Sequence, residues 1–153
     1  MKVKTILFYL PEGTLNDATE YYIGILEEAF KEKGFKVFYS GDIKEVSKHK
    51  YILTIEAKHF LKVKLKKPSA KVINWFQGVV AEEALLTTNS LLRKRVWQFF
   101  ELFTLCFSNL NIYVSESMRL YFEKKYKVRN QNFFIMPCFN KQQNTELVDE
   151  RKY

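Results

Sequence analysis

Polar residues directly follow the apolar runs that we interpret as strands, and these are the residues that could do chemistry. Ligands of an open α/β sheet bind beyond the carboxyl ends of its strands, so residues at these positions should share one rim. Carboxylates, amides and hydroxyls of this kind suit sugar hydroxyls, which need several directed hydrogen bonds. The candidate rim comprises Glu12, Gly13, Thr14, Glu56, Lys58, His59, Gln77, Gly78, Ser115 and Glu116.

Each candidate also has an ordinary structural interpretation. Ser115 precedes a helical pattern and suits an N-cap, where a hydroxyl accepts a hydrogen bond from the backbone. A lone histidine such as His59 is more often a surface or packing residue. Glu82 and Glu83 suit the first turn of a helix, whose N-terminus favours negative charge. Gly78 follows a buried strand and suits either a tight turn or a close approach to the backbone.

Several common sites are excluded. The loop PEGTLND after the first apolar run has neither a dinucleotide-binding G-x-G-x-x-G nor a P-loop G-x-x-x-x-G-K. It also lacks the acidic pair that a phospho-acceptor domain needs. G-x-S-x-G, H-E-x-x-H and paired C-x-x-C motifs are missing from the sequence. We therefore expect neither zinc nor serine-hydrolase chemistry, no metal and no cofactor, and the residue types alone identify no catalytic group.

Basic residues cluster in two places. Six lysines and no acid lie between Glu56 and Glu82, and Arg93, Lys94 and Arg95 interrupt the most apolar helical pattern. Solvated lysine faces are the ordinary interpretation. The triplet beside Trp97 and Phe99 also suits anionic lipid headgroups, to which each nearby cation contributes about 1 kcal/mol. The aromatic residues follow core periodicity, which disfavours nucleic acid as a partner.

Composition indicates a folded domain. The chain has 153 residues, of which 47% are hydrophobic and 16% aromatic, with a formal charge of +8. Cys106 and Cys138 lie in apolar runs without metal-like spacing, which favours a reducing compartment. The apolar run in 1–9 is too short for a secretion signal, and no stretch reaches the roughly 18 apolar residues of a membrane span. We expect a cytoplasmic protein, at most peripheral on the inner face of a membrane.

The central element is the run KVINWFQG at Lys71–Gly78, whose β-branched and aromatic residues predict a strand buried on both faces. Further strands are predicted at 5–10, 35–39, 51–55, 110–114 and 133–136. Helices are predicted at about 16–33, 58–67, 90–107 and 116–125, with a loop after Gly78. The alternation predicts an α/β, Rossmann-like open parallel sheet of about six strands with helices on both faces. The 90–107 helix is apolar on most sides, so it is either buried centrally or covered by something the chain does not supply.

Three passages resemble a known family: NWFQG at 74–78, NIYVSESMRLYF at 111–122 and FFIMPCFN at 133–140. Together they resemble the amino-terminal domain of GT-B glycosyltransferases, in the family 4-like group that builds capsules and other envelope polysaccharides. The resemblance implies that the acceptor binds this domain, and that the nucleotide-sugar binds mostly a second domain across a cleft. The loops at 12–14, 77–78 and 115–116 would face that cleft. Many relatives have a histidine or acid where this chain has Gln77, so the catalytic residue stays unassigned.

The resemblance leads us to expect an acceptor-binding domain over residues 1–140, with 141–153 as a polar tail or the start of a linker. Its partners would be a glycan or lipid-linked sugar and a nucleotide-sugar-binding domain or subunit, without which it would be inactive. Two alternatives stay open. One is a non-catalytic partner module that docks through its apolar helix. The other is a flavodoxin-like domain that binds an anion, although PEGTLND supplies only part of the phosphate loop it would need.

Overall fold

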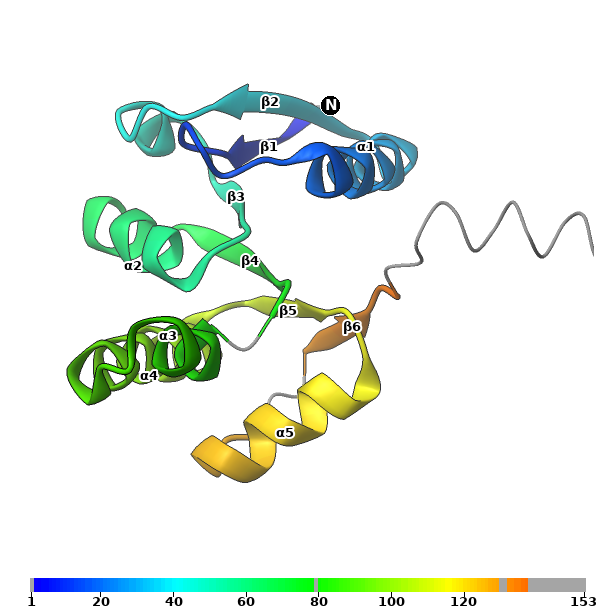
Figure 1. Cartoon of the computed structure of the whole chain (residues 1–153). Helices are drawn as coiled ribbons and strands as arrows, with labels where there is room; N and C mark the ends of the chain where they lie inside the picture. The colour runs from blue at the N-terminus through cyan, green and yellow to red at the C-terminus, as the bar shows by residue number, and fades with distance from the viewer. Residues whose placement is uncertain (1, 79, 130–131, 138–153) are drawn as a thin grey trace, which may run out of the picture.

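The computed structural model describes residues 2–78, 80–129 and 132–137, and within them an open parallel sheet organises the molecule (Figure 1). The strand order is β2-β1-β3-β4-β5-β6 and every neighbouring pair is parallel. This confirms the predicted α/β, Rossmann-like fold. The strands are β1 (Lys4–Tyr9), β2 (Phe35–Ser40), β3 (Tyr51–Thr54), β4 (Lys71–Phe76), β5 (Leu110–Tyr113) and β6 (Phe133–Ile135).

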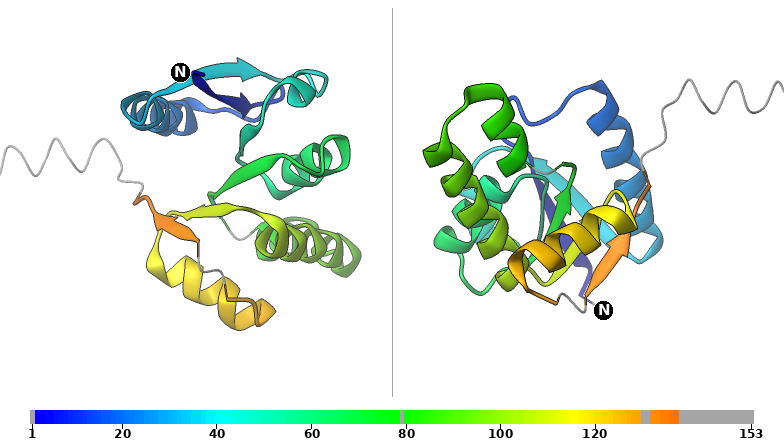
Figure 2. Two further views of the ribbon diagram at one scale, coloured as in Figure 1. Left: turned by 180° about the vertical axis from the view of Figure 1, so that it is seen from behind. Right: turned by 60° about the horizontal axis from the view of Figure 1, so that its bottom comes forward.

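Helices lie on both faces of the sheet, as predicted (Figure 2). On one face Ile6, Leu53 and Trp75 form a core with α1. On the other face Leu7 and Ile52 pack with α2 and the short helix η1. A third cluster joins the ends of β4 and β5 to α4 and α5. The helices are α1 (Asp17–Glu32), η1 (Glu45–Lys48), α2 (Ala57–Lys66), α3 (Val80–Thr88), α4 (Leu91–Phe107) and α5 (Glu116–Tyr126).

Helix α2 shows how context decided an ambiguous pattern. Leu61, Val63 and Leu65 alternate with lysines as in a strand, yet the segment is a helix that ends at Lys66, before Pro68. Val63 is fully buried while Leu65 is 73% exposed, so the three apolar residues do not share one face. A parallel β3–β4 pair requires a crossover, and a helix supplies it.

A row of polar side chains crosses the sheet inside the core. Thr54, Asn74 and Asn111 stand side by side on β3, β4 and β5, and each is fully buried. The Thr54 hydroxyl donates to Asn74 Oδ1 at 2.7 Å, and the Ser108 hydroxyl donates to Asn111 Oδ1 at 2.8 Å. We call Thr54, Asn74 and Asn111 the polar row.

The connection between β4 and β5 differs from the prediction. Instead of a loop, residues 80–88 form helix α3, with Glu82 and Glu83 in its first turn as interpreted from the sequence. The predicted long helix is α4, and the Ser90 hydroxyl caps it by accepting a hydrogen bond from the Arg93 N–H. In the described part of the chain no helix is both long and apolar enough to cross a bilayer. Cys138 and the predicted tail lie outside the described residues.

Candidate functional site

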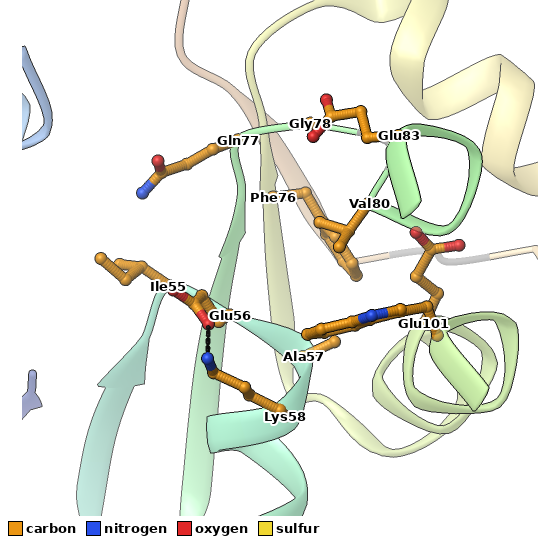
Figure 3. Close-up of a pocket in the computed structure, with 11 residues that line it drawn as sticks. Ile55, Glu56, Ala57, Lys58, Phe76, Gln77, Gly78, Val80, Glu83 and Glu101 are labelled. Atoms are coloured by element: carbon orange, nitrogen blue, oxygen red, sulfur yellow. Dashed lines mark ion pairs between the residues drawn. The ribbon is translucent and has the colours of Figure 1, made fainter. Parts of the chain in front are cut away.

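A cavity of about 440 Å³ opens at the carboxyl ends of β3 and β4, where the fold predicts a ligand site (Figure 3). Its wall comes from the end of β3, the first turn of α2, the end of β4, and helices α3 and α4. We call it the β3–β4 pocket. Its lining residues are Ile55, Glu56, Ala57, Lys58, Phe76, Gln77, Gly78, Val80, Glu83, Trp97 and Glu101.

Gly78 leaves space for a carboxylate at the pocket. A Cβ atom added at Gly78 would lie 2.8 Å from Glu83 Oε1, and Figure 3 shows the two residues side by side. Positive φ angles occur at Gly13 and Gly34 but not at Gly78. The glycine therefore serves close approach of a side chain, not a left-handed backbone. The Glu83 carboxylate makes no hydrogen bond or ion pair with any described residue, so it is available to a ligand.

The opposite wall is the start of α2. Glu56 is the N-cap residue, but its side chain makes no capping bond; it forms an ion pair with Lys58 at 2.9 Å. Figure 3 shows this pair on the side of the pocket away from Glu83. Lys58 is the lining residue with a cationic side chain, and its charge is already balanced by Glu56.

Glu101 forms part of the remaining wall and is almost fully buried, with 1% of its surface exposed. Its Oε1 atom accepts a hydrogen bond from the Ala81 N–H at 3.0 Å, which caps the start of α3. Its Oε2 atom accepts one from the Tyr126 hydroxyl of α5. Burial raises the pKa of Glu101, and the two hydrogen bonds oppose that shift. Because both oxygens are engaged, Glu101 holds α3, α4 and α5 together at the pocket.

Trp97 of α4 gives the pocket an aromatic surface. Its side chain is half-buried and packs edge-on against Phe100, with ring centroids 5.5 Å apart. Ile55, Phe76 and Val80 add aliphatic and aromatic wall nearby. The pocket thus combines an indole and apolar wall with a few directed polar groups, which is the usual composition of a small-molecule site.

A second, smaller cavity of about 320 Å³ lies on the other side of Gln77, between the start of α1 and the ends of β4 and β5. Gln77 lines both cavities, and its Oε1 atom accepts a 3.4 Å hydrogen bond from the Thr19 hydroxyl. Trp75 lines this second cavity, and its buried indole N–H has no partner among the described residues. Gln77 is exposed and stands at the boundary between two hollows of the rim.

The other predicted rim residues do not line either cavity. Glu12 and Gly13 are exposed on the β1–α1 loop, and the Thr14 hydroxyl donates to the Pro11 carbonyl. Ser115 caps α5 by accepting a hydrogen bond from the Met118 N–H at 3.1 Å, and Glu116 pairs with Arg119. The structure therefore brings Glu56, Lys58, Gln77 and Gly78 together at one pocket and gives Ser115 the structural role of a cap.

His59 lies inside the fold and not on the rim. It is 4% exposed, and its ring packs edge-on against Tyr9 with centroids 5.9 Å apart. Burial lowers the pKa of His59, so its neutral form is favoured. Its Nδ1 atom has no hydrogen-bond partner among the described residues. His59 is therefore a packing residue in the core, which was the ordinary interpretation of its sequence.

The three residues of the basic triplet Arg93, Lys94 and Arg95 have different environments in the fold. Lys94 forms an ion pair with Glu82 of α3 at 3.0 Å, and Lys125 of α5 reaches the same carboxylate at 2.8 Å. Arg93 and Arg95 are exposed. Lys94 therefore joins helices, while the two arginines are the members of the triplet that solvent can reach.

Sequence reasoning did not identify three residues of the β3–β4 pocket as part of a site: Glu83, Trp97 and Glu101. Glu101 carried a usable signal, because it is the one carboxylate in the helical pattern 91–107. An acid within an otherwise apolar and basic helix needs a buried partner or a function. Trp97 carried no such signal, since it is one of several large apolar residues in this stretch, with Val96, Phe99 and Phe100 close by in sequence.

The chemistry of the pocket favours a neutral, hydroxyl-bearing ligand. Glu83 and the Gln77 amide can bond hydroxyl groups, whereas the Glu83 carboxylate, which has no partner among the described residues, would repel a diphosphate. Among the described residues no cluster of histidine, cysteine and acidic side chains has the geometry to hold a metal ion. Comparison of the chain with protein-family models, curated proteins and solved structures gave no match.

Proposed function

We propose that this chain is the acceptor-binding domain of a GT-B-type glycosyltransferase, and that a sugar of the acceptor occupies the β3–β4 pocket. The observation that carries the proposal is the joint presence of Trp97, Glu83 and the Gln77 amide around one cavity at the carboxyl ends of the strands. An indole offers an apolar plane to the C–H face of a sugar ring, while the carboxylate and amide bond its hydroxyl groups.

The size of the pocket supports a small ligand. Its volume of about 440 Å³ falls in the usual range of roughly 300–1,000 Å³ for small-molecule sites. The passages NWFQG and NIYVSESMRLYF support the glycosyltransferase family, and NWFQG contributes Phe76, Gln77 and Gly78 to the pocket itself. Sequence resemblance and cavity thus point to the same segment.

Charge supports the assignment of donor binding to another domain. A departing nucleoside diphosphate must be stabilised by a metal, by basic side chains or by a free helix N-terminus. At the β3–β4 pocket the available cation, Lys58, is paired with Glu56, the Glu56 carboxylate stands at the N-terminus of α2, and Glu83 lies across from it. We therefore expect this domain alone to bind nucleotide-sugars weakly and to transfer no sugar.

The test is a titration of the ¹⁵N-labelled chain with neutral sugars, glucuronate, and UDP- and GDP-sugars, followed by NMR. A neutral sugar should shift the Trp97 indole and Gln77 side-chain signals with roughly millimolar affinity, which is usual for a single ring with few contacts. Glucuronate should bind more weakly, because its carboxylate meets Glu56 and Glu83.

Two variants make the titration specific. Trp97→Leu and Glu83→Gln should each weaken sugar binding, and Phe99→Leu, two residues further along and on the exposed side of α4, should not. Glu83→Gln should also improve glucuronate binding relative to neutral sugars. Tight binding of a nucleotide-sugar, or sugar binding that Trp97→Leu leaves unchanged, would contradict the proposal.

A further inference from the structure

The outward side of helix α4 is unusually apolar. Leu91, Leu92, Phe99 and Phe107 are 70%, 75%, 55% and 58% exposed. Solvent-exposed helix faces normally carry polar residues, so an exposed apolar strip of this length indicates a surface that another phase or molecule covers. We define the α4 face as Leu91, Leu92, Val96, Phe99, Leu102 and Phe107.

The apolar surface continues onto α2. Leu65 of α2 is 73% exposed, and it lines a shallow cavity of about 190 Å³ together with Phe107 and Phe103 of α4. Contacts between α2 and α4 hold the two helices against each other. The exposed apolar residues of both helices therefore form one surface.

The charges on this surface are all positive. Lys62 and Lys66 of α2 and Arg93 and Arg95 of α4 are exposed, and none of the four makes an ion pair with a described residue. Helix α2 contains no acidic residue, and the one acid of α4, Glu101, is buried on the opposite side of the helix. An apolar surface with unpaired cations is complementary to a surface that is both apolar and anionic.

We propose that the α4 face docks on an anionic lipid bilayer. The apolar side chains enter the boundary between headgroups and acyl chains, and the four cations contact lipid phosphates, as in interfacial amphipathic helices. A second copy of this chain would bring the same positive charges face to face, which like-charge repulsion disfavours. With 17 residues, α4 is about 25 Å long and lies in the plane of the interface.

Binding to a membrane would also place the β3–β4 pocket close to lipid. Trp97 and Glu101 line the pocket from α4, while Leu92 and Phe99 belong to the α4 face on the same helix. The separation is therefore about one helix diameter, roughly 10 Å. This consequence rests on the proposed function and favours a lipid-linked acceptor; the docking proposal itself rests only on the exposed apolar and basic residues of α4 and α2.

The experiment is co-sedimentation of the full chain with phosphatidylcholine vesicles, with and without phosphatidylglycerol. Binding should require phosphatidylglycerol and fall as salt rises, because the Debye length shrinks from about 10 Å at 0.1 M to about 3 Å at 1 M. Leu92→Ser/Phe99→Ser should abolish sedimentation. Arg93→Gln/Arg95→Gln should weaken it by about twentyfold or more, since each cation near the surface contributes about fivefold.

Matched controls come from another surface. Leu120→Ser replaces a half-exposed leucine of α5, and Lys124→Gln/Arg129→Gln removes two exposed cations outside the α4 face. Both should bind as the unchanged chain does, and circular dichroism should show all variants folded. Binding to neutral vesicles alone, binding that survives Leu92→Ser/Phe99→Ser, or no binding to either vesicle would overturn the proposal.

Sedimentation equilibrium without lipid tests whether a second copy of the chain, instead of a bilayer, covers the α4 face. The unchanged chain should be monomeric at concentrations at which it binds vesicles fully. A dimer that Leu92→Ser/Phe99→Ser dissociates would assign the α4 face to a second copy and would overturn the lipid proposal.

Discussion

Helices α1 and α4 are nearly equal in length, with 16 and 17 residues, but they differ in which residues they bury and which they expose. Helix α1 buries Ile23 and Leu26 against the sheet and turns its charged residues to solvent. Helix α4 buries Glu101 and Thr104 and exposes leucines and phenylalanines. The two helices differ in where most of their apolar residues point: α1 directs Ile23 and Leu26 into the core, whereas α4 contributes Leu105 to the core and leaves a whole row of leucines and phenylalanines in solvent.

The two helices are also fastened differently. In α1 the Lys31–Glu27 ion pair lies within the helix, one turn apart. In α4 the polar groups reach other helices: Glu101 binds the Ala81 N–H and Tyr126, and Lys94 binds Glu82. Helix α4 is therefore held on its inner side by these polar contacts as well as by Leu105 and Phe103, which leaves its outer side free for another partner.

The largest expected effect distinguishes the apolar faces of the two helices. Ile23→Ala in α1 should destabilise the protein by about 2–5 kcal/mol, because it leaves a cavity in the core. Phe99→Ala in α4 should change the free energy of unfolding by less than about 1 kcal/mol, because 55% of Phe99 is already exposed to solvent. Urea unfolding followed by circular dichroism measures both, and Ile25→Ala, at an exposed site of α1, is the control. Equal losses of unfolding free energy for Ile23→Ala and Phe99→Ala would contradict the claim that Ile23 belongs to the core and Phe99 does not.

The next effect concerns the inner side of α4. Glu101→Leu should cost about 2–4 kcal/mol, because it leaves the Ala81 N–H and the Tyr126 hydroxyl without an acceptor. Glu101→Gln should cost much less, since its amide oxygen can accept from Ala81 and its NH₂ group can donate to the Tyr126 oxygen. Similar losses for both variants, measured by urea unfolding, would show that the hydrogen bonds are not what holds α4.

The same pair of proteins gives a pH test. Burial raises the pKa of Glu101 in the folded state, so protonation favours folding. This contribution is complete below the pKa of the unfolded state and is lost as pH rises through the folded-state pKa. The unchanged chain should therefore gain stability relative to Glu101→Gln as pH falls from about 7 toward 4. A difference in free energy of unfolding between the unchanged chain and Glu101→Gln that stays constant or shrinks as pH falls would contradict the burial argument.

The smallest effect belongs to the ion pairs of Glu82. Hydrogen bonds from Lys125 and Lys94 lower the pKa of Glu82 to about 2. The stability it contributes is present above its ordinary pKa and is lost as pH falls toward the folded-state value. Because the Glu82 side chain is 37% exposed, solvent screening limits Glu82→Gln to less than about 1 kcal/mol at neutral pH. Thermal unfolding measures it against Glu28→Gln in α1; an equal loss in that control would remove any special role for Glu82.

Most of the fold followed from sequence pattern. Apolar β-branched runs marked all six strands to within one or two residues, and the cap predicted at Ser115 marked the start of α5. Helix α3 was missed as an element because its nine residues carry a weak apolar pattern, although its first-turn glutamates were recognised. Local patterns succeed where one element meets the sheet directly, and α3 packs mainly on α4.

Less of the candidate site could be predicted. Strand ends indicated Glu56, Gln77 and Gly78, because parallel strands bring their carboxyl ends to one edge. Trp97 and Glu101 come from a helix distant in sequence, and its rotation about its own axis decides which residues face the pocket. That rotation depends on Glu101 meeting the Ala81 N–H and Tyr126, a tertiary match that no local pattern contains.

The polar row has a consequence for how the chain avoids folding incorrectly. If the strands were uniformly apolar, a register shift of two residues between neighbouring strands would still present apolar side chains to both layers of helices. Here such a slip would move Thr54 from Asn74 to Val72 or Phe76, and its buried hydroxyl would lose its acceptor. An unpaired buried hydroxyl costs roughly 1–3 kcal/mol, a large share of the stability of a domain this size. The three polar side chains thus penalise misaligned pairing of β3, β4 and β5, the strands whose carboxyl ends must meet at the rim of the pocket.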